Sequence, residues 1–280
     1  MSFGTLVSTA ELAAHLEDPA WVAFDCRYDL FDHEAGTRAY AEDHVPGAFY
    51  LHLGRDLSGV MTGTNGRHPL PEPAAFADLM GRFGVNRGVQ VVAYDGGPGP
   101  YAARLWWMLR WLGHRDVAVL DGGYARWIAE GRPVSAAIPP ARPARFQAAA
   151  GDRPLSALDV EAHLGQPDQL IVDARSPDRF RGENETLDPV GGHIPGAVNR
   201  FFMTNLGADG CFKPAAQLRD EFRAILAGQD PPAVVHQCGS GVTACHNLLA
   251  MEIADLGGSR LYPGSWSEWC ADPARPVAKG

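Results

Sequence analysis

Short apolar runs alternate with longer helical patterns along this chain of 280 residues. The runs at 89–95 (VQVVAYD), 117–123 (VAVLDGG) and 233–238 (AVVHQC) are short and rich in β-branched residues, which predicts buried strands. The segment 101–113 (YAARLWWMLRWLG) is longer and predicts a helix between the first two strands. Strands that alternate with helices in this way predict an α/β fold, in which a mostly parallel sheet carries helices on both faces.

The two halves of the chain repeat the same pattern. Ser8 with Glu11, and Ser156 with Asp159, have the spacing of a capping box at the start of a helix, and each pair precedes an apolar run that ends in Asp-x-Arg. Four blocks recur in the same order: 6–27 over 155–175, 44–50 over 193–199, 91–109 over 234–252 and 120–127 over 262–269. Such self-similarity indicates a tandem duplication.

The junction between the halves has the composition of a linker. Residues 132–154 are rich in proline and alanine and lack apolar periodicity. A chain of this length also suits two domains rather than one. We therefore expect an N-terminal domain over 1–145 and a C-terminal domain over 154–280.

Composition and charge exclude several classes of partner. The chain has 24 Lys+Arg against 33 Asp+Glu, a formal charge of -9, so we expect neither nucleic acid nor an anionic membrane as partner. The N-terminus lacks the features of a secretory signal and no apolar run approaches the ~20 residues of a membrane span, so we expect a cytoplasmic protein. Its five cysteines are an odd number and include no CxxC pair, which supports neither a disulfide framework nor a zinc-ribbon pattern, so we expect reduced thiols. We expect no metal and no cofactor.

The duplication separates scaffold from candidate chemistry. Features common to both halves, such as Asp25 with Arg27 and Asp173 with Arg175, are expected to form turns and ion pairs. Five positions differ in kind: Cys238 replaces Asp95, Ser240 replaces Gly97, Thr243 replaces Pro100, Ser265 replaces Gly123 and Arg179 replaces Phe31. Each exchange gives the second half a thiol, a hydroxyl or a cation. We therefore expect one active domain and one catalytically inactive domain that keeps the scaffold.

Cys238 is the candidate nucleophile. It ends an apolar run, and Gly239 and Gly241 allow the chain after it to curl so that several backbone N–H groups converge on an anion. A helix expected from about Val242 adds its positive end, and both effects favour the thiolate. The alternative interpretation is an inert, buried residue at the end of a strand, which leaves the Gly-Ser-Gly-Val-Thr sequel unexplained.

The loop 238–244 (CGSGVTA) closely resembles the active-site loop of the rhodanese-type sulfurtransferases, in particular those that use mercaptopyruvate. The resemblance covers almost the whole chain, as two rhodanese-like domains in tandem. It implies that Cys238 takes a sulfur atom from a small anionic donor as a persulfide and passes it to a thiol, such as that of thioredoxin, or to cyanide.

The same resemblance implies a role for each matched residue. The loop amides from Gly239 through Gly241 and Val242 to Thr243, with the hydroxyls of Thr243 and Ser265, would hold the transferred sulfur. Arg179 would bind the anionic end of the donor. Ser240 would act together with an aspartate and a histidine from the first half, for which Asp56 and His68 are the candidates.

One departure from the family pattern leaves the donor open. The mercaptopyruvate enzymes carry a second arginine shortly after the first, but residues 182–193 read GENETLDPVGGH. Arg181 could take its place, or it could be a solvated surface charge. The loop favours mercaptopyruvate, since thiosulfate enzymes carry Arg and Lys after the cysteine, whereas the missing arginine leaves thiosulfate as the alternative.

Rival interpretations are distinguishable in the sequence. A phosphatase with a loop cysteine would need an arginine to hold phosphate, and Ala244 stands there. A sulfur-carrying module without turnover would lack the thiol, as the first half does, where Asp95 stands in place of the cysteine. Cys245, His236 and His246 are interpreted as buried packing or hydrogen-bonding residues rather than as a resolving thiol or metal ligands.

Overall fold

The computed structural model describes residues 2–140 and 142–280, which form two compact units. The first unit consists of Met1–Gly59, Leu70–Asp152 and Ala208–Cys211, and the second consists of Val60–Pro69, Arg153–Gly207 and Phe212–Gly280. Each half of the repeat thus builds one unit but contributes one short segment to the other. The segment from the first half, Val60–Pro69, brings His68 into the second unit.

The first unit is built on a parallel sheet with the strand order β1-β5-β4-β2-β3. Its strands are β1 (Leu6–Val7), β2 (Trp21–Asp25), β3 (Phe49–Tyr50), β4 (Gln90–Tyr94) and β5 (Val117–Leu120). Its helices are α1 (Thr9–Ala14), α2 (Ala35–Glu42), α3 (Pro73–Arg82), α4 (Pro100–Trp111) and α5 (Gly123–Ala129). The predicted capping box of Ser8 and Glu11 is present at the start of α1.

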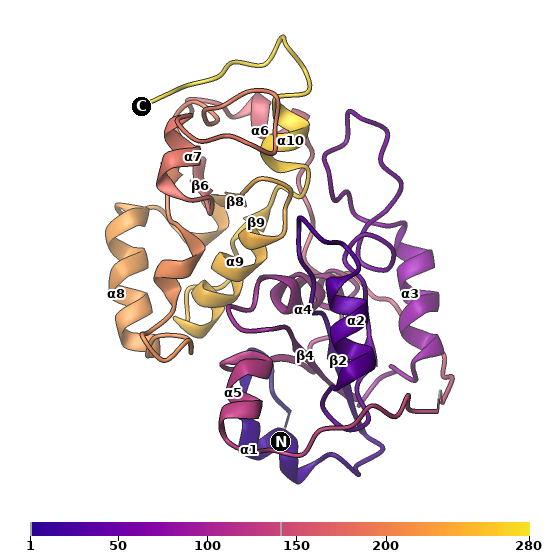
Figure 1. The fold of residues 1–280 in the computed structure, drawn as a ribbon. Coiled ribbons are helices and arrows are strands. Elements are labelled where there is room, and N and C mark those ends of the chain that lie inside the picture. The colour runs from indigo at the N-terminus through magenta and orange to yellow at the C-terminus, as the bar shows by residue number, and fades with distance from the viewer. Residues whose placement is uncertain (1, 141) are drawn as a thin grey trace. The chain divides into compact units, whose positions relative to one another are not determined.

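The second unit repeats this plan with four parallel strands in the order β7-β6-β8-β9. The strands are β6 (Leu170–Asp173), β7 (Val198–Asn199), β8 (Val234–Gln237) and β9 (Arg260–Leu261). The helices are α6 (Ala157–Ala162), α7 (Pro177–Arg181), α8 (Ala215–Leu226), α9 (Thr243–Ile253) and α10 (Ser265–Trp269), with short 3-10 turns at Phe202–Asn205 and Pro231–Ala233. Helices α8 and α9 lie side by side (Figure 1).

Alternate residues of the strands face opposite layers of helices in the second unit. Ile171 and Val235 pack in a cluster with Trp266 of α10, whereas Val172 and Val234 pack with Phe222 of α8. Burial of such side chains stabilises the fold by about 1.5–3 kcal/mol each. Both faces of the sheet are therefore covered, and the predicted α/β fold is confirmed.

The shared Asp-x-Arg stretches hold corresponding turns in both units. Arg27 Nε donates to the two carboxylate oxygens of Asp25 at 3.1 and 2.9 Å, and Arg175 Nε does the same to Asp173 at 3.1 and 3.0 Å. Both aspartates are fully buried. These pairs support the strand ends, as the repeat predicted. In the part of the chain that is described, no helix has the length and apolar character needed to cross a membrane.

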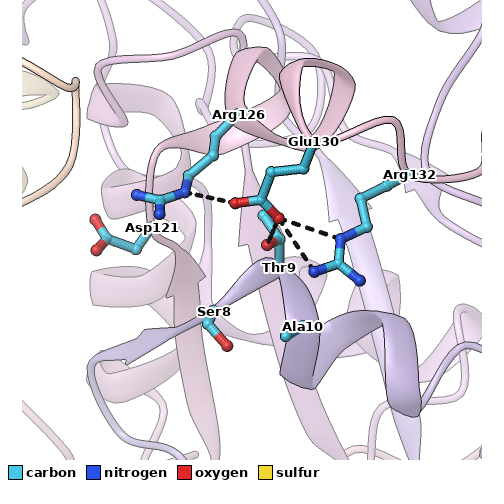
Figure 2. A pocket seen from close by; sticks show the side chains of 7 residues that line it. All are labelled: Ser8, Thr9, Ala10, Asp121, Arg126, Glu130 and Arg132. Carbon is cyan, nitrogen blue, oxygen red and sulfur yellow. Dashed lines mark hydrogen bonds and ion pairs between the residues drawn. The ribbon is translucent and has the colours of Figure 1, made fainter.

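A small cavity in the first unit is lined by residues that form an ion-pair network with one another (Figure 2). Its volume is about 230 Å³, and it is lined by Ser8, Thr9, Ala10, Asp121, Arg126, Glu130 and Arg132. Glu130 accepts hydrogen bonds from Arg126 Nε at 2.9 Å and Arg132 Nη2 at 3.1 Å, and it also accepts one from the Thr9 hydroxyl. Because one carboxylate already contacts both cations, we assign no ligand to this cavity.

Candidate active site

Cys238 lies at the carboxyl end of β8, a central strand of the second sheet, in the loop that leads to α9. Only 2% of its surface is exposed. The start of α10 holds this loop through the backbone, since Trp266 N and Ser267 N donate to the carbonyls of Cys238 and Gly239 at 2.9 Å each. Ligand sites of parallel sheets occur at this edge.

Two glycines of the loop permit close approaches that a side chain would block. Gly241 has φ +75, and a Cβ atom there would lie 2.2 Å from the carbonyl oxygen of Pro263. A Cβ atom on Gly239 would lie 2.9 Å from Arg67 Nη2 and 3.4 Å from Arg179 Nη2. Gly241 therefore allows the loop to pack against the chain before α10. Gly239 allows two guanidinium groups to reach the loop backbone.

Ser265 supports the backbone of Cys238, the candidate nucleophile. Its Oγ accepts a hydrogen bond from Cys238 N at 3.0 Å and donates one to the carbonyl of Tyr262 at 2.9 Å. The hydroxyl proton is thus directed at a carbonyl rather than at the thiol. Thr243 begins α9 and is partly exposed, and Val242 before it is buried.

The side chains of His68 and Ser240 lie within hydrogen-bonding distance of each other. His68 Nδ1 lies 2.8 Å from Ser240 Oγ, and both residues are buried in the second unit. The neighbouring backbone is held as well, because Arg67 N donates to Ser267 Oγ at 3.1 Å. Asp56 belongs to the first unit, where its carboxylate accepts a hydrogen bond from His52 N at 2.8 Å.

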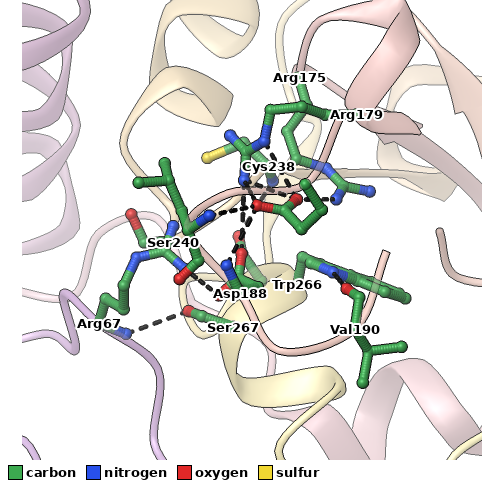
Figure 3. Close-up of polar contacts among 12 residues, drawn as sticks. Arg67, Arg175, Arg179, Asp188, Val190, Cys238, Ser240, Trp266 and Ser267 are labelled. Atoms are coloured by element: carbon green, nitrogen blue, oxygen red, sulfur yellow. Dashed lines mark hydrogen bonds and ion pairs between the residues drawn. The ribbon is translucent and has the colours of Figure 1, made fainter. Parts of the chain in front are cut away.

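Arg179 is part of a cluster of ion pairs beside the loop (Figure 3). Its Nε and Nη2 donate to Glu185 at 3.1 and 2.8 Å, and Nη2 lies 3.4 Å from Asp188. Asp188 also pairs with Arg67 Nη1. Burial raises the pKa of Asp188, with the three arginines Arg67, Arg179 and Arg175 opposing. For Glu185, the backbone amide of Leu187 and the Arg179 guanidinium outweigh burial and lower the pKa.

The sequence analysis missed Arg67, Glu185 and Asp188. Arg67 directly precedes the candidate His68, and the two carboxylates lie in the stretch where the family's second arginine is absent. Their closeness in sequence to His68 and to the missing arginine was the signal that could have identified these three residues. Arg181, the other substitute considered for that arginine, forms an exposed pair with Glu183 at 2.7 Å and so behaves as a surface charge.

The remaining sulfur and imidazole groups near the loop are buried. Cys245 Sγ donates to the carbonyl of Gly241 at 3.3 Å. Burial lowers the pKa of His236 to about 3, so this imidazole is neutral at physiological pH, and its Nε2 lies 3.0 Å from Met251 Sδ. His246 Nδ1 lies 3.2 Å from the side-chain amide of Asn205. Among residues 2–140 and 142–280, no three metal-ligating side chains gather at one place.

Comparison with known proteins relates both halves of the chain to one family. The model of the rhodanese-like domain matches residues 8–130 and again 156–272. A probable 3-mercaptopyruvate sulfurtransferase of Pseudomonas aeruginosa is 49% identical over the whole of both chains. A thiosulfate sulfurtransferase of Bos taurus is 37% identical over 99% of this chain and 96% of its own.

A solved structure agrees with these relatives. The 3-mercaptopyruvate sulfurtransferase from Leishmania major superimposes with a TM-score of 0.84 over 95% of this chain and 74% of its own, at 32% identity. The expected family, two-domain fold and enzyme class are therefore confirmed. The chain belongs to the rhodanese-like family, and it is a sulfurtransferase.

Proposed function

We propose that Cys238 is the nucleophile of this sulfurtransferase and that 3-mercaptopyruvate is its preferred sulfur donor. The supporting observation is the place of the cations. The loop from Gly239 to Val242 carries none, whereas the guanidinium groups of Arg67 and Arg179 stand beside Gly239. Such an arrangement suits a donor whose carboxylate lies a few bonds away from its sulfur. The relative at 49% identity, named for mercaptopyruvate, supports the same donor.

The first half-reaction loads the sulfur. The Cys238 thiolate attacks the sulfur of mercaptopyruvate, a sulfur–sulfur bond forms and the carbon–sulfur bond breaks. The electron pair of the broken bond stays on carbon as the enolate of pyruvate, which takes up a proton to give pyruvate, while the outer sulfur of the persulfide keeps the proton of the donor thiol. We assign the supply of the enolate proton to the Ser240 hydroxyl. His68, whose Nδ1 lies 2.8 Å from Ser240 Oγ, would return a proton to the serine, and solvent would restore the proton of the imidazole.

The surrounding residues prepare the loop for this step. The amides of Gly239, Gly241, Val242 and Thr243, with the Thr243 hydroxyl, would stabilise the negative charge that is shared over the two sulfurs in the transition state. The helix that starts at Thr243 adds its positive end. Ser265 positions Cys238 through the backbone amide. The role of Asp56 as the partner of His68 rests on the family resemblance.

The second half-reaction unloads the sulfur. An acceptor thiolate, such as that of thioredoxin, or cyanide attacks the outer sulfur, and the thiolate of Cys238 leaves. We infer a cytoplasmic setting, which the five unpaired cysteines support because reducing compartments keep thiols free. Subcellular fractionation followed by detection of the protein would test that location.

Intact-mass spectrometry tests the nucleophile. The wild-type protein incubated with mercaptopyruvate should gain the mass of one sulfur atom, and Cys238→Ser should gain none. Cys211→Ser, which removes a buried thiol from the first unit, serves as the matched control and should gain sulfur normally. Absence of an adduct with both mercaptopyruvate and thiosulfate, together with unchanged transfer by Cys238→Ser, contradicts the proposal.

The donor is decided by steady-state kinetics on one preparation. We expect kcat/KM for mercaptopyruvate to exceed kcat/KM for thiosulfate with cyanide as the common acceptor. The reverse order would make thiosulfate the main donor, the activity for which the bovine relative is named. A persulfide that forms but never turns over would instead indicate a sulfur-carrying module.

A further inference from the structure

We propose that Arg67 is a second donor-binding arginine, which acts beside Arg179 on the anionic end of the sulfur donor. This inference rests on the proposed function of Cys238. Residues 182–193 lack the second arginine, and Arg67 would replace it. Arg67 comes from the first half of the repeat, but it lies on the segment Val60–Pro69, which packs within the second unit.

The segment that carries Arg67 is fixed against α10. Gly66 has φ +83, and a Cβ atom there would lie 2.8 Å from the carbonyl of Gly264. The next residue, Arg67, donates its backbone N–H to Ser267 Oγ at 3.1 Å. The base of the side chain is therefore held by the same chain segment that holds the backbone of Cys238, so that the guanidinium is presented in a defined direction (Figure 3).

Asp188 orients the two guanidinium groups as a pair. Its carboxylate, only 2% exposed, pairs with Arg67 Nη1 through one oxygen and lies 3.4 Å from Arg179 Nη2 through the other. Arg67 Nη1 is also 3.5 Å from the Leu187 carbonyl, and Arg179 Nε and Nη2 donate to Glu185. Without this negative charge between them, two neighbouring guanidinium groups would repel each other.

Each arginine keeps at least one side-chain nitrogen for a ligand. Among the hydrogen bonds formed by the described residues, none uses Arg67 Nη2 or Arg179 Nη1. These two nitrogens lie 2.9 and 3.6 Å from the position that a Cβ atom of Gly239 would take, directly beside Cys238. Both side chains are partly exposed, by 28% and 19%. A carboxylate placed there can accept one hydrogen bond from each arginine.

Alkylation of Cys238 tests this arrangement without relying on sulfur transfer. Iodoacetate carries a carboxylate and iodoacetamide is its neutral analogue, so the ratio of their rate constants at Cys238, measured by peptide mass spectrometry, reports a nearby anion site. Arg67→Ala should lower this ratio about tenfold, since it removes one charge-assisted hydrogen bond at a partly exposed position. Arg67→Lys, which keeps the charge but not the planar fork, should give an intermediate ratio.

Steady-state kinetics provide the second readout, and Arg181→Ala provides the matched control. The KM for mercaptopyruvate should rise about tenfold in Arg67→Ala while kcat changes little, because the lost contact binds donor and transition state alike. Arg181 lies two residues after Arg179 in an exposed pair, so its removal should leave both readouts unchanged. Equal slowing of both alkylating reagents in Arg67→Ala would show that Arg67 only holds the loop, and an unchanged ratio with an unchanged KM would also overturn the proposal. If the wild type forms no persulfide, the proposed function fails, but the alkylation ratio still decides whether Arg67 binds an anion.

Discussion

The loops that follow β4 and β8 have the same place in the two sheets, but their backbone amides differ in whether they bind a carboxylate of their own loop. In the first unit, the carboxylate of Asp95 accepts hydrogen bonds from four backbone amides: Gly97 at 3.1 Å, Gly99 at 2.9 Å, Tyr101 at 3.0 Å and Ala102 at 3.3 Å. In the second unit, the corresponding amides of Ser240 and Val242 donate to no side chain of the described residues. The first loop contains its own carboxylate, and the second has no such internal acceptor for these two amides, which is consistent with the proposed sulfur site.

Burial explains why the first loop serves as scaffold. Asp95 is 2% exposed, and burial raises the pKa of its carboxyl, while the four amides oppose that shift. A buried carboxylate is stable only where such donors surround it. Because those donors are used within the loop, the first unit gains a rigid turn but no open anion site. The loop after β4 is thus stabilised by its own carboxylate, whereas the corresponding loop after β8 carries Cys238, the proposed nucleophile.

Exchange of the two tip residues should have the largest effect. Cys238→Asp gives the second loop an anion of its own and removes the thiol, so sulfur transfer should fall to the uncatalysed background, by at least about 10³-fold. The reciprocal variant, Asp95→Cys, should acquire no persulfide in intact-mass measurements, since its loop has Gly97 and Pro100 where the second has Ser240 and Thr243. Transfer by Cys238→Asp above background, or a persulfide on the introduced thiol of Asp95→Cys, would contradict the division of labour.

Removal of the internal anion should destabilise the first unit. Asp95→Ala leaves four amides without their acceptor, which should lower the free energy of unfolding of this unit by about 2–4 kcal/mol. Hydrogen exchange of peptides from β4 and α4 measures the loss. Asp95→Asn retains one acceptor oxygen and should lose less. Equal exchange in wild type and Asp95→Ala would mean that the carboxylate does not stabilise the loop.

Acidification should affect the two central strands differently. His236 in β8 corresponds to Ala93 in β4, and burial lowers the pKa of His236 from 6.5 to about 3. The unfolded chain binds a proton at His236 near pH 6.5, whereas the folded protein binds it only near pH 3. The contribution of His236 to the free energy of unfolding is therefore fully present above pH 6.5. It is lost as the pH falls towards 3, at a slope of up to about 1.4 kcal/mol per pH unit.

The matched variant isolates this histidine. His236→Gln cannot titrate in this range, so hydrogen exchange of the β8 peptide should lose most of the added acid sensitivity between pH 6 and pH 4.5. Exchange in β4, which contains no histidine, should respond in the same way in both proteins. Identical acid sensitivity of β8 in wild type and variant would show that other groups dominate.

The predictable and unpredictable parts of this molecule differ in the range of the interactions that determine them. Strands, helices and capping boxes depend on residues close in sequence, and the exchange of Asp95 for Cys238 was visible because the repeat supplied a reference. Arg67 was missed because its direction depends on the packing of Gly66 against Gly264, about 200 residues away in the chain. No periodicity records such a contact. The meeting of His68 with Ser240 was implied only by the family resemblance.

The hydrogen bonds of Ser265 also depend on contacts that the sequence does not record. The sequence analysis assigned its hydroxyl to the transferred sulfur, whereas the structure directs the hydroxyl to the backbone of Cys238 and Tyr262. Its counterpart Gly123 has φ +59, and Ser265 itself has φ +55. A left-handed backbone costs a non-glycine residue about 1–3 kcal/mol. The second unit therefore has a strained residue at this turn, and the hydroxyl of that residue accepts a hydrogen bond from the backbone amide of Cys238.

Two substitutions at Ser265 separate strain from hydrogen bonding and should give the smallest effect. Ser265→Ala removes the hydroxyl but keeps the strain, so it should destabilise the second unit by about 1–2 kcal/mol. Ser265→Gly removes both, and the relief of strain should offset the lost hydrogen bonds to within about 1 kcal/mol. Both should lower kcat to a similar degree, because both release the Cys238 amide. If thermal unfolding shows Ser265→Gly to be no more stable than Ser265→Ala, the left-handed turn is not strained. If kcat falls in neither variant, the hydroxyl does not position the nucleophile, and the two units differ at this turn in residue type alone.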